Sequence, residues 1–182
     1  AGGGLFLVRD RLPWPPQEVR FANGRATPWL PVRDGSGLIE IEAVIRGRAL
    51  SAVIDSGAEF TAIDRQTAEA LGLPRPVAAP LIVYGVSGGP TMAHTVRLDL
   101  ELPGLTAPGL RAAALDLAQV AQLAGREFRL LIGRDLLRPV VLEADLPARR
   151  TRLVAPTACR SPGGAARPWR PSGSATPDRW RR

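Results

Sequence analysis

Several residue types are scarce in this chain of 182 residues, and their scarcity excludes several kinds of site. The chain has one cysteine, Cys159, and one histidine, His94, which excludes an internal disulfide framework and any zinc cluster of cysteine and histidine. A Ser-His-Asp triad would have a single candidate base. No apolar run approaches the ~18 residues of a membrane-spanning helix. Lysine is absent and all 24 basic residues are arginine, which is typical of GC-rich coding rather than of selection for guanidinium chemistry.

The formal net charge of +7 comes from the C-terminal end of the chain. Residues 1–147 hold 15 arginines against 16 acidic residues, whereas residues 148–182 hold nine arginines against one acid, Asp178. An interpretation as a nucleic-acid-binding protein would therefore rest on this tail alone, where Trp169 and Trp180 could stack on bases. The tail is also rich in Pro, Gly and Ser, so we interpret it as a solvated extension and not as a nucleic-acid module.

Composition divides the chain into three parts. Residues 1–36 are rich in proline and are predicted to form an extended arm with one strand, over 19–22. Residues 37–155 form the predicted folded domain, and residues 156–182 form a tail predicted to be disordered. The chain begins without a methionine or a clear signal-peptide pattern, so the compartment stays open, with the cytoplasm slightly favoured over the periplasm.

Hydrophobic periodicity predicts a mainly β domain with a few short helices. Ile39 and Ile41 alternate with Glu40 and Glu42, which is typical of a strand that buries its isoleucines and exposes its glutamates. Asp64 is a plausible N-cap for a helix over 64–71. Further helices are predicted over 118–124 and 134–137, and further strands over 49–54, 81–86, 91–102, 110–115, 128–132, 140–143 and 151–154.

The first motif of chemical interest, Asp55-Ser56-Gly57-Ala58, follows directly on an apolar strand. A carboxylate at the end of a buried strand is costly unless it is paired or has a chemical role. Gly57 allows the backbone to approach closely and to donate its N–H to that carboxylate. The alternative is an ordinary β-turn, because Asp, Ser and Gly are typical turn residues.

A second motif, LLIGRDLL over residues 130–137, places Gly133 78 residues after Asp55. It joins an apolar strand to Gly-Arg-Asp and then to two leucines. Between the two motifs lies a glycine-rich hairpin tip, YGVSGG, over residues 84–89. The hairpin also satisfies the G-x-S-x-G pattern of a hydrolase nucleophile. We reject that alternative because Gly88-Gly89-Pro90 is a poor helix start and no acid lies between Ser87 and His94.

Together, the two motifs, the hairpin and their order over residues 38–154 resemble the retropepsin-like aspartic proteases of bacterial type. The resemblance implies a closed, mainly β acid-protease barrel with one or two short helices. It also implies an aspartic endopeptidase that hydrolyses extended peptides without a metal or another cofactor. Because the chain carries one Asp-Ser-Gly and the chemistry needs two carboxylates, the active form would be a homodimer.

The resemblance further assigns roles to individual residues. Asp55 would be the catalytic carboxylate, and the rest of its loop would be Ser56, Gly57, Ala58 and Glu59. The flap over the substrate would be Gly85, Val86, Ser87, Gly88 and Gly89. The element supporting the catalytic loop would be Ile132, Gly133, Arg134 and Asp135. Arg134 is expected to form a buried ion pair with Glu59.

A different class of function also fits these residues. A catalytically silent dimer of the same fold, which binds peptides or organises a complex, could keep the Asp-Ser-Gly-Ala motif. The sequence does not separate this alternative from the protease, and binding of nucleic acid ranks third.

Overall fold

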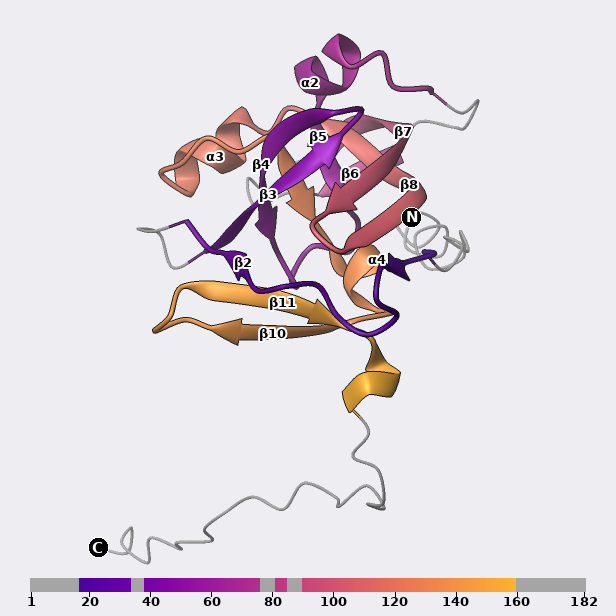
Figure 1. Cartoon of the computed structure of the whole chain (residues 1–182). Helices are drawn as coiled ribbons and strands as arrows, with labels where there is room; N and C mark the ends of the chain where they lie inside the picture. Colours follow the sequence, from indigo (N-terminus) through magenta and orange to yellow (C-terminus); the bar gives the residue numbers. More distant parts are fainter. Residues whose placement is uncertain (1–16, 34–37, 76–80, 85–89, 160–182) are drawn as a thin grey trace, which may run out of the picture.

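The computed structural model describes residues 17–33, 38–75, 81–84 and 90–159 (Figure 1). The proposed flap, over residues 85–89, and most of the predicted tail therefore lie outside the described residues. The strands are β1 (Arg20–Phe21), β2 (Leu30–Pro31), β3 (Ile39–Ile45), β4 (Arg48–Ile54), β5 (Ala62–Asp64), β6 (Leu81–Tyr84), β7 (Pro90–Leu102), β8 (Leu105–Leu115), β9 (Leu130–Ile132), β10 (Val141–Asp145) and β11 (Arg150–Val154). The helices are α2 (Arg65–Ala70), α3 (Ala118–Leu123), α4 (Arg134–Leu137) and a 3-10 turn, Pro156–Cys159.

Six of these strands close into a barrel, which confirms the predicted mainly β, closed-barrel architecture. The strands follow one another in the order β8, β5, β9, β4, β3 and β7, and β7 pairs back onto β8. β4 runs parallel to β9, and β5 runs parallel to β8, whereas the other neighbours in the barrel are antiparallel. The carboxyl ends of β4 and β9, which carry the two motifs, therefore lie side by side.

Apolar side chains pack on both faces of the barrel strands. The larger cluster fills the barrel, and its fully buried members include Ile41, Ile45, Ile63, Leu100, Leu105, Leu110, Leu130, Ile132 and Leu136. The smaller cluster lies beneath α3 and includes Val53, Ala62, Ala93, Ala113, Leu117, Phe128 and Leu131. Ala58 of the first motif packs against this second cluster. Both ends of the Asp55 loop are thus attached to packed structure.

A second sheet, below the barrel in Figure 1, brings part of the proline-rich arm onto the domain. Its strand order is β10, β11 and β2, and β1 pairs with β8 of the barrel. Thr27 joins the arm to β11, because its N–H donates to Leu153 O at 2.9 Å and its hydroxyl accepts from Leu153 N at 3.1 Å. Residues 20–31 therefore pair with the folded domain, and the boundary at residue 36 stays a prediction.

The prediction for Glu40 is wrong, because its side chain is buried. Its carboxylate accepts hydrogen bonds from Ser51 Oγ at 2.6 Å and from Arg126 Nη1 at 3.0 Å. Arg33, on the arm, lies 3.7 Å away. The residue does face out of the barrel, as its alternation with Ile41 predicts, but these polar side chains cover it and compensate its charge.

Two further findings concern helices. Helix α2 begins after Asp64, whose carboxylate accepts from Thr67 N at 3.1 Å, so the predicted N-cap is confirmed.

No helix among the described residues is both long and apolar enough to cross a membrane.

Candidate active site

Asp55 lies at the end of β4, directly beside the second motif. Its N–H donates to Ile132 O at 2.9 Å, which continues the parallel ladder in which Ile54 is opposite Ile132. Two motifs far apart in the sequence are thus adjacent at the carboxyl ends of neighbouring strands. The apolar side chains of β4 and β9 pack on both faces of the barrel wall, and the loops that follow these strands carry the polar groups.

The turn that follows β4 fixes the Asp55 carboxylate. Gly57 N–H donates to Asp55 Oδ1 at 2.8 Å, and Ala58 N–H donates to Asp55 O at 3.2 Å. Asp55 is half-buried, whereas Ser56 and Gly57 are exposed. One oxygen of the carboxylate is therefore held by the backbone, and the neighbouring loop surface is open to solvent in the single chain.

The second motif packs against the far end of this loop. Arg134 N–H donates to Ala58 O at 2.9 Å. A Cβ on Gly133 would lie 2.5 Å from the carbonyl carbon of Phe60 and 2.9 Å from Thr61 N, which no real side chain tolerates. Gly133 is thus required for the close approach of two backbones, and its N–H donates to Thr61 Oγ1 at 3.2 Å.

Asp135 and Thr61 form a buried polar pair behind the loop. The Thr61 hydroxyl donates to Asp135 Oδ1 at 2.7 Å, and Thr61 N–H donates to both carboxylate oxygens at 3.0 Å. Leu136 N–H donates to the same carboxylate at 2.9 Å. Burial raises the pKa of the Asp135 carboxyl, although these hydrogen bonds oppose that effect by favouring the charged form.

Replacing Asp135 by Asn is therefore expected to change how stability depends on pH. The pKa of an Asp carboxyl in the unfolded chain is about 3.9. A carboxyl whose folded-state pKa is higher than this stabilises the fold fully only when the pH is below the unfolded-state pKa. That contribution is lost as the pH rises through the folded-state pKa. The free energy of unfolding of Asp135→Asn minus that of the wild type should thus rise with pH. Urea denaturation of both proteins at several pH values from about 3.5 to 7 measures this difference in the free energy of unfolding. A difference that falls with pH would contradict a raised pKa for the Asp135 carboxyl.

The ion pair expected between Glu59 and Arg134 is present, but it is half-exposed and not buried. Arg134 Nη2 bonds to one Glu59 oxygen, and Arg138 Nη2 lies 2.9 Å from the other. The side chains of Glu59, Arg134 and Arg138 are 49%, 47% and 65% exposed. The prediction of a buried pair is wrong because Glu59 on the loop and Arg134 on α4 both lie at the surface, where water solvates them.

Removing one arginine from this pair should consequently cost little stability. We expect Arg134→Ala to lower the free energy of unfolding by about 1 kcal/mol or less, because exposed ion pairs contribute little and Arg138 still pairs with Glu59. Urea denaturation of the variant, beside Arg75→Ala at an exposed pair with Glu69, provides the comparison. A loss of about 3 kcal/mol at Arg134 alone would indicate a pair shielded from solvent.

The remaining candidates lie on the hairpin between the two motifs. Its arms, β6 and the start of β7, pair antiparallel, as the sequence predicts, and Tyr84 is opposite Pro90. His94 is exposed on β7, opposite Ala114 of β8. Among the described residues, no group of three His, Cys, Asp or Glu side chains could hold a metal ion.

Sequence reasoning missed Thr61 and Arg138, although both contact the predicted site. Thr61 precedes a three-residue strand, and nothing in its local pattern distinguishes it from other threonines. Arg138 lies one helical turn after Arg134, and this spacing is the signal that both could reach one acid.

Comparison with known proteins gives a consistent assignment. Residues 41–136 match a protein family described as "Aspartyl protease". A search of curated proteins found no match. Among solved structures, a retropepsin-like aspartic protease from Rickettsia conorii is similar at 17% identity and a TM-score of 0.51, over 76% of this chain and 93% of that one.

Two further structures are similar over shorter stretches. The protease of simian foamy virus (mac) is 20% identical with a TM-score of 0.37, over 54% of this chain and 91% of its own. The retroviral protease-like domain of Ddi1 from Leishmania major is 20% identical with a TM-score of 0.38, over 59% of this chain and 81% of its own.

Proposed function

Because this chain belongs to the aspartyl protease family, we propose that it is an aspartic endopeptidase whose active form is a homodimer, with one Asp55 from each subunit. The position of Asp55 carries the proposal. It is a half-buried carboxylate at the end of a barrel strand, held by Gly57 N–H and adjacent to the second motif.

The other carboxylates near this loop support the need for a second copy. Asp135 is buried and accepts from Thr61 and Leu136, and Glu59 is paired with two arginines. Both carboxylates are thus already engaged by other partners. A two-fold axis beside Asp55 would supply the second carboxylate from an identical chain, and the exposed Ser56 and Gly57 lie at the surface that such a partner would cover.

In that dimer the two Asp55 carboxylates, about 3 Å apart, would share one proton. The ionised carboxylate takes a proton from a water molecule, and the water oxygen attacks the carbonyl carbon of the peptide bond. The protonated carboxylate gives its proton to the carbonyl oxygen. The carboxyl group that took the proton from water then gives it to the amide nitrogen, the other carboxylate takes a proton from a hydroxyl of the diol, and the C–N bond breaks. The substrate would bind as an extended strand beneath the hairpins of the two subunits.

A cleavage assay on a peptide library at mildly acidic pH, with the wild type beside Asp55→Asn, tests this proposal. Cleavage by the wild type alone supports the protease. If both proteins bind peptides and neither cleaves them, the silent peptide-binding dimer is the correct function.

A further inference from the structure

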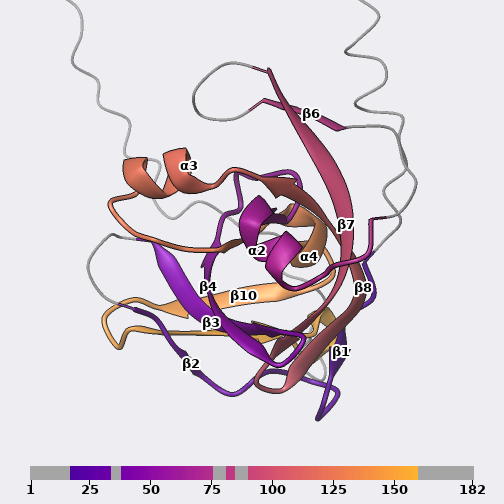
Figure 2. The ribbon, with the colours of Figure 1, turned by 90° about the horizontal axis from the view of Figure 1, so that it is seen from above.

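The hairpin formed by β6 and the start of β7 extends beyond the barrel (Figure 2). Leu81–Tyr84 pair with Pro90–Ala93 of the same hairpin, and the pairing of β7 with β8 begins only at His94. The position of this hairpin relative to Asp55 therefore depends on contacts other than the barrel ladder.

Arg65 makes such a contact from a well-anchored position. It is the first residue of α2, and its Nη2 donates to Met92 O on the hairpin at 3.3 Å. The preceding residue, Asp64, is buried, caps the helix and belongs to β5, which pairs with both β8 and β9. The hydrogen bond thus joins the closed barrel to the extending hairpin.

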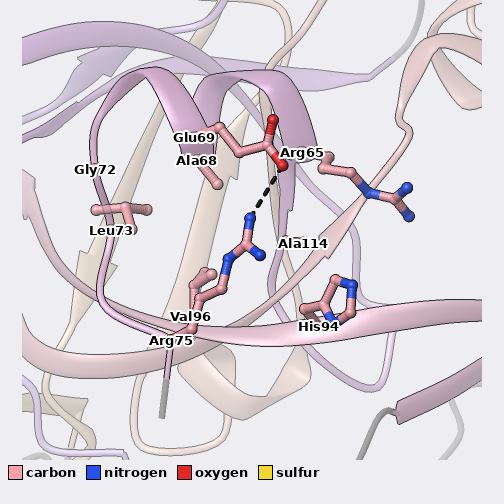
Figure 3. Close-up of a pocket in the computed structure, with 9 residues that line it drawn as sticks. All are labelled: Arg65, Ala68, Glu69, Gly72, Leu73, Arg75, His94, Val96 and Ala114. Atoms are coloured by element: carbon pink, nitrogen blue, oxygen red, sulfur yellow. Dashed lines mark hydrogen bonds and ion pairs between the residues drawn. The ribbon is translucent and has the colours of Figure 1, made fainter. Parts of the chain in front are cut away.

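The Arg65 side chain is half-buried where it reaches the hairpin. Its Nε is buried and has no hydrogen-bond partner among the described residues. Arg65, Arg75 and His94 line one pocket between α2 and β7, in which Arg75 turns toward Glu69 (Figure 3).

We propose that Arg65 is a positioning residue that fixes the β6–β7 hairpin against the barrel and thereby governs how tightly substrate is held. The effect on substrate rests on the proposed function, whereas the effect on the hairpin is a property of the fold. Arg75 provides a matched control, because it lines the same pocket but pairs with Glu69 instead of the hairpin.

Amide hydrogen exchange of the full chain tests the proposal directly. We expect exchange in peptides covering residues 81–93 to be about three- to tenfold faster in Arg65→Gln than in the wild type, which is the effect of losing one hydrogen bond. Arg65→Lys, which keeps a charged donor, should restore most of the protection. Exchange in β3 and β4 should not change, and Arg75→Gln should behave as the wild type.

Steady-state kinetics on one peptide substrate provide the second measurement. Arg65→Gln should raise KM several-fold with little change in kcat, since the hairpin would hold the substrate before and during reaction. Equal exchange at residues 81–93 in Arg65→Gln and the wild type, or the same acceleration in Arg75→Gln, would overturn the proposal. The exchange result does not depend on proteolysis, so it distinguishes failure of this proposal from failure of the protease assignment.

Discussion

Replacing Asp55 by Asn should lower kcat/KM for peptide cleavage by at least ~10⁴-fold, because the symmetric dimer would lose both its acid and its base at once. The fold should be retained. Asn has the same shape as Asp, and its Oδ1 can still accept the hydrogen bond from Gly57 N–H. The free energy of unfolding should thus change by less than about 1 kcal/mol.

The assay compares the initial rates of purified wild type and Asp55→Asn on one peptide, together with urea denaturation of both. Asp99→Asn is a matched control, because it makes the same substitution at an exposed carboxylate that accepts from Gly109 N–H. Its neighbour Leu100 pairs with Ile45, at the opposite end of the β3–β4 ladder from Asp55. The Asp99→Asn variant should cleave at the wild-type rate. An Asp55→Asn variant that also cleaves at the wild-type rate would exclude Asp55 as the catalytic group.

Gly133→Ala should be the most destabilising single-methyl change near the site. The new Cβ would lie 2.5 Å from the Phe60 carbonyl carbon and 2.6 Å from its oxygen, and backbone atoms cannot move aside as a side-chain end can. We expect a loss of about 3 kcal/mol or more, at the upper end of the cost of overpacking. The clash should also push the two motifs apart, and this displacement should lower the peptidase activity.

Gly47→Ala separates this clash from the general cost of replacing a glycine. Gly47 has φ +73° and nothing within 4 Å of a built Cβ, so alanine there meets backbone strain alone. That strain should cost about 1–2 kcal/mol. Urea denaturation of both variants gives the comparison. If Gly133→Ala is no more destabilising than Gly47→Ala, the close approach of the two loops is not required for stability.

The parts of the fold that the sequence predicts are those with a strong local signal. The alternation from Ile39 to Ile45 indicates β3, and the Asp64 cap with Gly72 at φ +57° bounds α2. The two motifs each end an apolar strand, so their meeting follows once β4 and β9 are neighbours. The family resemblance supplies that pairing, which periodicity alone does not.

The features that the sequence does not predict depend on long-range contacts. β2 has two residues and β5 has three, which are too short to show a period, and each is defined by its partners. Glu40 is buried by Arg126, 86 residues away. The exposure of Glu59 follows from its place on the loop surface and not from its residue type. No local pattern contains this information.

Mixing wild type with Asp55→Asn tests the central claim, a shared active site with one Asp55 from each subunit. After subunits have exchanged at constant total protein, a mixed dimer holds one Asp55 and is expected to be inactive. Activity should follow the square of the wild-type fraction, so an equal mixture should keep about one quarter of the wild-type activity. An equal mixture that keeps about one half, with activity linear in the wild-type fraction, would contradict the claim, because each chain would then work alone.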